Sequence, residues 1–240
     1  MPLYLSEKIN ILFIHIPKTG GTTIENWIMS TGNFKQLFFS EHILEDTRVT
    51  GQHFGHETLS VLIGDINNSH LYKFAVVRNP YDRLISEFFY RVKTKDLLLG
   101  KRPEKYFSTW VENILNKYKE DNSILDNHIR PQRFFVGEDV NYFKFENGIY
   151  GIIEDLANEL NIEITQTIES KKVGERKEVM WSESALRKVK EIYECDFEYF
   201  KYSKEEIITE EVNLLKRIGC KIVFYFRTKK RLIKLINLFN

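Results

Sequence analysis

The chain has 240 residues, 42% of them hydrophobic and 14% aromatic, so it can bury the core of one ordinary domain and is not disordered throughout. A net charge of +1 gives no global field for nucleic acid, so any basic site has to be local. Cys195 and Cys220 have no paired spacing, which disfavours a disulfide framework or a zinc site. With neither a signal-peptide pattern nor an apolar run long enough to span a bilayer, we expect a cytoplasmic protein.

Two strand–turn–helix units are predicted in the first half of the chain. Residues 9–16 (INILFIHI) are apolar at nearly every position, which is typical of a strand buried on both faces of a parallel sheet. A helix follows, and Gly32 can end it. Residues 71–77 (LYKFAVV) repeat the buried pattern, and Pro80 suits the first position of a second amphipathic helix. This order predicts an α/β fold with parallel strands.

The middle of the chain is mostly helical. Ser108 and Ser182 each precede an apolar stripe of helical spacing, so we expect both to cap helices. Residues 140–145 (VNYFKF) alternate weakly, as a strand does, and residues 148–160 read as a further helix.

The amino-acid composition changes near Lys204, where a charged sequence with helical spacing begins. It leads to the basic amphipathic tail RTKKRLIKLINLFN. We expect a domain over residues 1–203 and a C-terminal extension over 204–240. A tail helix packed on the domain or on a second subunit is favoured, and peripheral contact with a membrane surface is the alternative. The sequence does not predict the oligomeric state.

The turn PKTGGTT joins the first predicted strand to its helix. Such a glycine-rich turn presents backbone N–H groups at the positive end of a helix dipole, which suits a phosphate or sulfate group. Lys18 supplies a mobile charge, and the other candidate ligands are Thr19, Gly20, Gly21, Thr22 and Thr23. Because the lysine precedes the glycines, this is not a Walker A loop. The alternative is a plain strand-to-helix turn.

A second polar corner, VVRNPYDRLISEF, ends the strand at residues 71–77. Ligands of open α/β sheets bind at the carboxyl ends of strands, so Arg78 should lie beside the first turn if the two strands are neighbours. An arginine can grip a phosphate in a bidentate manner, and Ser86 on the following helix could add a hydrogen bond. Taken alone, Ser86 fits a solvated helix position better.

Together, IHIPKTGGTT and FAVVRNPYDRLISEF closely resemble motifs of the Golgi-type carbohydrate sulfotransferases (sulfotransferase family 2) and their bacterial relatives. Weaker likenesses in NHIRPQRFFVG, VNYFKFEN and YECDFEYFKY extend the resemblance over about residues 9–202. It implies a P-loop-like three-layer sandwich with a central, mostly parallel sheet flanked by helices. It also implies transfer of a sulfuryl group from PAPS (3′-phosphoadenosine-5′-phosphosulfate) to a carbohydrate hydroxyl, leaving PAP as the product.

The resemblance also implies roles for single residues. Lys18 would contact the transferring sulfuryl group, and the residues that follow it, from Thr19 to Thr23, would hold the 5′-phosphate. Arg78 and Ser86 would hold the 3′-phosphate. A nucleotide or sugar kinase on the same type of sheet, or a degenerate nucleotide-binding module without activity, remain the alternatives.

Sulfuryl transfer needs a base for the acceptor hydroxyl, and a histidine has a suitable pKa. Relatives carry such a histidine in the region GQHFGHETL, commonly after a glycine, so His56 is favoured and His53 is second, with Glu57 and a purely structural role as alternatives. The H-x-x-H spacing of His53 and His56 has no carboxylate or cysteine cluster to complete a metal site, and this chemistry needs no metal. His15, inside a buried strand, fits a core histidine better.

The acceptor site is the least defined part of the sequence. His128 resembles a family position near acceptor and nucleotide, and a histidine that only orders its loop is an equal alternative. Arg130, Gln132 and Arg133 are candidates for binding a charged sugar. We expect a carbohydrate or glycan acceptor and no nucleic-acid partner, while the particular hydroxyl cannot be predicted because acceptor loops vary freely on such folds.

Overall fold

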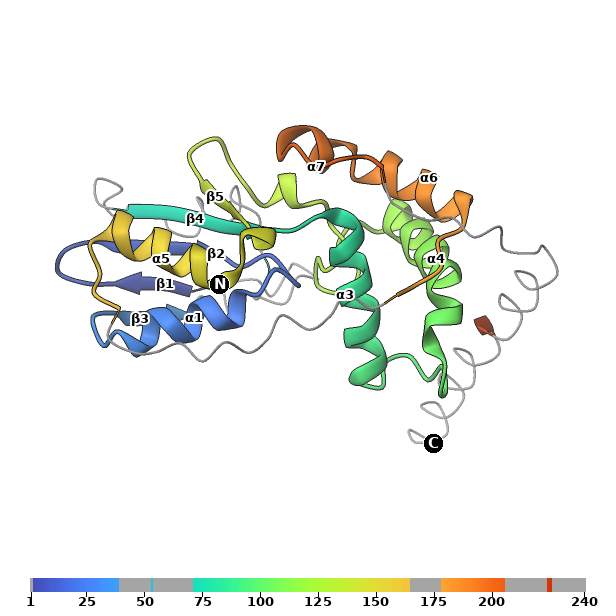
Figure 1. Ribbon diagram of the computed structural model, residues 1–240, viewed down its shortest axis with the longest axis horizontal. Helices are drawn as coiled ribbons and strands as arrows, with labels where there is room; N and C mark the ends of the chain where they lie inside the picture. The colour runs from blue at the N-terminus through green and yellow to red at the C-terminus, as the bar shows by residue number, and fades with distance from the viewer. Residues whose placement is uncertain (1, 39–52, 54–70, 165–177, 206–223, 226–240) are drawn as a thin grey trace. The chain divides into compact units, whose positions relative to one another are not determined.

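The computed structural model describes residues 2–38, 53, 71–164, 178–205 and 224–225 (Figure 1). The chain divides into two compact units, each built from two separate segments. The first unit comprises Met1–Asn79 and Asn122–Glu175, and the second comprises Pro80–Asp121 and Arg176–Asn240. All of the tail except residues 224–225 lies outside the described residues from 206 onward, so the prediction for 204–240 stays a prediction.

The first unit contains a five-stranded sheet in the order β3-β1-β2-β4-β5. Its strands are β1 (Pro2–Leu5), β2 (Asn10–Ile14), β3 (Lys35–Phe38), β4 (Leu71–Val77) and β5 (Asn141–Lys144). β2, β4 and β5 are parallel neighbours, as the buried apolar runs predicted. β1 is antiparallel to both β2 and β3, so the sheet is mixed. The prediction of an α/β fold is confirmed, and its mostly parallel sheet is confirmed for these three strands.

The register of the parallel strands brings three strand ends to one edge of the sheet. Ile14 of β2 lies opposite Ala75 of β4, and Val77 at the end of β4 lies opposite Lys144 at the end of β5. The segments that follow β2, β4 and β5 therefore leave the sheet side by side. This edge is where the sequence predicted that a ligand would bind.

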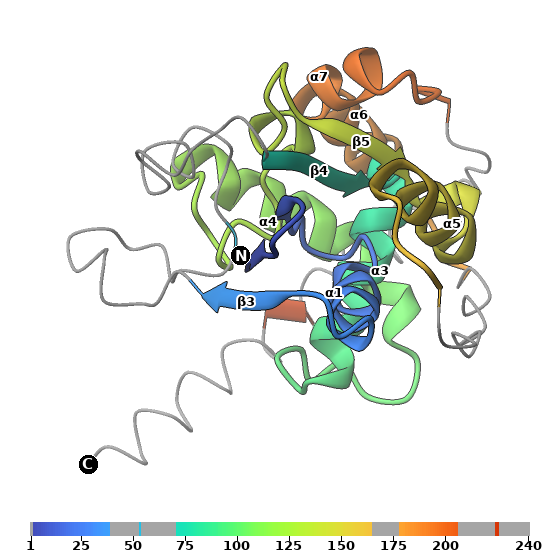
Figure 2. The ribbon, with the colours of Figure 1, turned by 90° about the vertical axis from the view of Figure 1, so that its left-hand side faces the viewer.

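Two helices cover one face of the sheet. They are α1 (Gly21–Ser30) and α5 (Ile149–Leu160), which lie side by side in Figure 2. Their apolar stripes pack on side chains of β1, β2 and β4 in one core, in which Phe13 and Phe74 stack with ring centroids 4.8 Å apart. The second helical layer of the predicted three-layer sandwich stays a prediction.

The second unit is helical in its described part. Its elements are α3 (Pro80–Lys93), η3 (Pro103–Tyr106), α4 (Phe107–Glu120), α6 (Glu183–Ile192) and α7 (Glu194–Tyr199). Buried aromatic rings form its core, including a contact between Phe107 and Trp181 with centroids 4.7 Å apart. The described residues contain no helix long and apolar enough to cross a membrane.

The two serine caps predicted from the sequence have opposite outcomes. The Ser182 hydroxyl accepts a hydrogen bond from the Ala185 N–H at 3.2 Å and caps α6, as predicted. The prediction for Ser108 is wrong, because the 3-10 helix η3 runs directly into α4 and leaves Ser108 inside the helix. Its hydroxyl instead accepts a hydrogen bond from the Ser182 N–H at 2.8 Å.

Candidate functional site: an anion cradle beside a histidine–aspartate pair

In the loop between β2 and α1, alternate residues have a left-handed backbone conformation. Lys18 has φ 70° and Gly20 has φ 86°, so two of its residues lie in the left-handed region. Alternation of this kind turns successive backbone N–H groups toward one concavity, which is an anion-binding geometry. No side chain caps α1 and its first turn holds no acidic residue, so the positive end of the helix is not neutralised locally.

The glycines of this loop are needed for close packing. A Cβ on Gly21 would lie 2.3 Å from Nε2 of His15, and a Cβ on Gly20 would lie 2.7 Å from the Cδ1 atom of Ile149 in α5. Gly20 also has the positive φ that glycine adopts without strain. A side chain at either position would therefore displace the loop, whether or not the loop binds a ligand.

The three threonines of the loop lie in different surroundings. Thr19 is fully buried, and its hydroxyl donates to the carbonyl of Ile16 at 2.9 Å. A phosphate contact from Thr19 would therefore come from its backbone N–H. Thr22 and Thr23 are exposed at the start of α1, and the Thr23 N–H donates to the Gly20 carbonyl at 3.0 Å. Their part in holding a phosphate stays a prediction.

Arg78 follows β4 directly and lies beside the first loop. Its Nη1 donates to the Lys18 carbonyl at 3.3 Å, and its guanidinium carbon lies 4.4 Å from the centroid of the Phe145 ring. The expected neighbourhood of the two polar corners is thus confirmed, while phosphate binding by Arg78 stays a prediction. Ser86 is half-buried on α3 and belongs to the second unit, so its predicted partnership with Arg78 also stays a prediction.

Gln132 holds the backbone of Arg78. The Arg78 N–H donates to its Oε1 at 2.9 Å, and its Nε2 donates to the Arg78 carbonyl at 2.7 Å. Gln132 is fully buried, on the 3-10 helix η4 (Gln132–Phe134). The expectation that Gln132 would bind a charged sugar is wrong, because its amide already makes two hydrogen bonds with the backbone at the end of β4.

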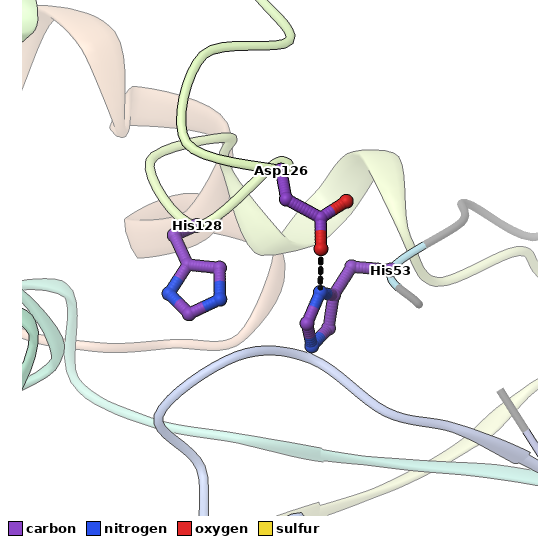
Figure 3. Close-up of side chains that lie close together, drawn as sticks. All are labelled: His53, Asp126 and His128. Carbon is purple, nitrogen blue, oxygen red and sulfur yellow. Dashed lines mark hydrogen bonds and ion pairs between the residues drawn. The ribbon is translucent and has the colours of Figure 1, made fainter. Parts of the chain in front are cut away.

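His53 lies in the first unit and pairs with a residue distant in sequence. Its Nδ1 lies 2.8 Å from Oδ2 of Asp126, and its other ring nitrogen points away from that carboxylate (Figure 3). An ionised carboxylate only accepts hydrogen bonds, so Nδ1 donates and Nε2 keeps its lone pair. The amide of Asn127 donates to the His53 carbonyl at 2.8 Å and fixes the backbone as well.

The turn that carries Asp126 has a strained backbone. Leu125, Asp126 and Asn127 have φ of 54°, 55° and 61°, so three consecutive residues other than glycine are left-handed. Each costs roughly 1–2 kcal/mol, although Asp and Asn tolerate the region better than leucine does. Strain of this kind persists where neighbouring contacts determine it and is concentrated at functional sites. Here it brings Asp126, Asn127 and His128 around one histidine.

The surroundings of His53 favour its neutral form. Burial lowers the pKa of His53 below its ordinary value of 6.5, and the hydrogen bond to Asp126 opposes this shift only in part. Two further imidazoles lie close, with the His15 ring centroid at 5.5 Å and that of His128 at 4.9 Å. His15 has its own carboxylate partner, Glu25, at 2.8 Å, and is the half-buried, satisfied histidine that the sequence suggested.

The remaining candidates for acceptor binding are engaged within the unit. The Arg130 guanidinium lies 5.4 Å from the centroid of the Phe134 ring, and Arg133 donates to the Val136 carbonyl and to the Glu138 carboxylate. His56, the favoured base, and Glu57 lie outside the described residues. Of these candidates for the base, His53 is the one that the structure describes.

Sequence reasoning missed Asp126 as part of the site. It lies 73 positions from His53, in a turn without hydrophobic periodicity. The one local signal was the run Asp126-Asn127-His128, because Asp and Asn are the side chains that most readily adopt left-handed turns.

The fold and this site define a class: α/β proteins with a glycine-rich strand–loop–helix turn, an arginine beside that turn and a histidine oriented by a carboxylate. A model of the sulfotransferase family matches residues 1–203, and the chain therefore belongs to that family. No curated protein and no solved structure matches the chain.

Proposed function

We propose that this protein is a PAPS-dependent O-sulfotransferase with a carbohydrate acceptor. The observation that carries the proposal is the meeting of Arg78 with the Lys18 loop, where the guanidinium donates to the Lys18 carbonyl. The ends of two parallel strands thus combine two cations with the positive end of α1, an arrangement suited to the two separate phosphate groups of PAPS. Membership of the sulfotransferase family supports the same donor.

The proposed reaction is an in-line displacement at sulfur. The acceptor oxygen forms a bond to sulfur while the bond from sulfur to the bridging phosphate oxygen breaks, and PAP leaves with the electron pair. Lys18 stabilises the charge that develops on that oxygen, and the residues from Thr19 to Thr23 hold the 5′-phosphate. Arg78 and Ser86 hold the 3′-phosphate. No step requires a metal.

For the base we propose His53, with His56 as the competing candidate. The Asp126 carboxylate accepts from Nδ1 at 2.8 Å, which leaves the lone pair on Nε2 for the acceptor proton. Asp126 acts as a positioning residue that selects this tautomer and stabilises the imidazolium once the proton arrives. Burial holds the pKa of His53 low, so the ring is neutral and ready to accept a proton near pH 7.

The donor site is tested by binding. We expect PAP to bind with micromolar or tighter affinity in calorimetry without Mg²⁺ and to raise the melting temperature. Arg78→Leu should weaken binding by at least about tenfold, because a charge-assisted phosphate contact contributes roughly 1.5–3 kcal/mol. Glu138→Gln, an exposed substitution in the same unit, serves as the control. Stabilisation by ATP with Mg²⁺ but not by PAP would reject the donor and favour the kinase alternative.

The base is tested by turnover in two matched variants, using labelled PAPS and a panel of glycans. His53→Gln should lower turnover by roughly 10²–10⁴-fold, the usual contribution of general base catalysis, and keep PAP affinity. The loss of turnover in His56→Gln should be at least about tenfold smaller than the loss in His53→Gln. A larger loss of turnover in His56→Gln than in His53→Gln would assign the base to His56. If the parent chain sulfates none of the glycans in the panel, a degenerate binding module is favoured.

A further inference from the structure

Three potential metal ligands meet where the strained turn reaches His53. The imidazoles of His53 and His128 and the carboxylate of Asp126 each offer one ligand atom, and these atoms lie within 4.8 Å of one another. Figure 3 shows the three side chains gathered at one point, two of them from the turn. All three are half-buried or buried, so a ligand held there would be shielded in part from water.

One oxygen of Asp126 is an independent sign that this cluster accepts a cation. Oδ2 accepts from His53, whereas Oδ1 is buried and has no hydrogen-bond partner among the residues that the structure describes. A buried carboxylate oxygen without a partner costs free energy, because water no longer solvates its charge. A metal ion coordinated by this carboxylate would remove that cost.

The donor set selects the kind of ion. Two imidazoles with one carboxylate suit Zn²⁺, whereas Mg²⁺ and Ca²⁺ prefer sites made of oxygen. In a tetrahedral zinc site the ligand atoms lie about 3.3 Å apart, since Zn–N and Zn–O bonds are about 2.0–2.1 Å long. Ligand atoms as much as 4.8 Å apart therefore have to approach one another by about 1.5 Å when the ion binds. The turn already holds the backbone of two ligands in place.

We propose that His53, Asp126 and His128 form a Zn²⁺ site, and that the bound ion inhibits sulfuryl transfer. The inhibitory half rests on the proposed function, since it requires His53 to be the base. A zinc ion on either ring nitrogen removes the proton acceptor: bound at Nε2 it takes the lone pair, and bound at Nδ1 it leaves the proton on Nε2. The metal and the acceptor hydroxyl then compete for one imidazole.

Binding is tested on the full chain by titrating Zn²⁺ against a chromophoric zinc indicator, with Co²⁺ as a spectroscopic substitute. We expect one ion per chain and a visible absorption band of low-coordinate Co²⁺. Asp126→Asn and His128→Asn should each weaken Zn²⁺ binding by at least about tenfold. His15→Asn is the matched control, because His15 also pairs with a carboxylate at 2.8 Å but belongs to no three-ligand cluster, and its affinity should stay at the parent value.

The outcomes separate the metal site from the proposed function. Weak binding in the parent chain, or equal affinity in all three variants, overturns the site, provided that circular dichroism shows each variant folded. PAP binding is measured separately, so a chain that binds Zn²⁺ but not PAP loses the proposed function and keeps the metal site. In a chain that transfers sulfate, saturating Zn²⁺ should abolish turnover and EDTA should restore it, whereas unchanged turnover at full occupancy overturns the inhibitory half.

Discussion

At the scale of single residues, Gln132 and Asp126 support the site by different means. Gln132 is neutral and offers one acceptor and one donor, which match the N–H and C=O of Arg78 at 2.9 and 2.7 Å. It therefore holds the backbone of Arg78 without placing a charge beside it. Asp126 is charged and acts on the side chain of His53, where its charge sets the tautomer.

Gln132→Leu should lower both stability and PAP affinity. The substitution removes two part-buried hydrogen bonds to the backbone of Arg78, each contributing about 0.5–1.5 kcal/mol, and loosens the arginine that we propose binds the 3′-phosphate. We expect a lower melting temperature and a weaker PAP complex in calorimetry. In the Arg78→Leu background the same substitution should not weaken PAP binding further, because the two residues act through one contact. An unchanged PAP affinity in folded Gln132→Leu would show that Gln132 is structural only.

At the scale of elements, the parts that could be predicted depend on local pattern. Short stretches of sequence are enough to recognise β2 and β4 by their apolar runs and α5 by its apolar stripe. Because ligands bind at the carboxyl ends of parallel strands, the sequence also predicts that Arg78 lies near the first loop. This is why the position of Arg78 beside the loop of Lys18 could be predicted. Its Gly-Gly pair was recognised, although the atoms that the glycines avoid, in His15 and Ile149, could not be foreseen.

The parts that could not be predicted depend on distant contacts. β1 and β3 have four residues each, too few for a periodic signal, and their antiparallel pairing made the sheet mixed. The turn at 125–127 is left-handed against the preference of Leu125, and its bonds to His53 join it to a residue far away in the sequence. Ser108 bonds to a residue 74 positions away, so a local capping rule gave the wrong helix start.

At the scale of the whole molecule, each compact unit buries a tyrosine hydroxyl. Tyr4 lies in the first unit and Tyr193 in the second, and both side chains are almost completely inaccessible to solvent. Burial raises the pKa of each phenol well above its ordinary value of 10.0, with Glu25 adding to the shift at Tyr4. The Tyr4 hydroxyl has no hydrogen-bond partner among the described residues.

These shifts predict a loss of stability at alkaline pH. Below pH 10 both states keep the phenolic protons, whereas above it the unfolded chain releases protons that the folded chain retains, so the free energy of unfolding falls as pH rises. Tyr4→Phe should raise that free energy by about 1 kcal/mol at pH 7, because it removes an unpaired buried hydroxyl, and should reduce its decline above pH 10. Urea unfolding at several pH values measures both effects, with Tyr225→Phe, at an exposed position, as the control. An equally steep decline in Tyr4→Phe would mean that Tyr4 does not contribute to the alkaline transition.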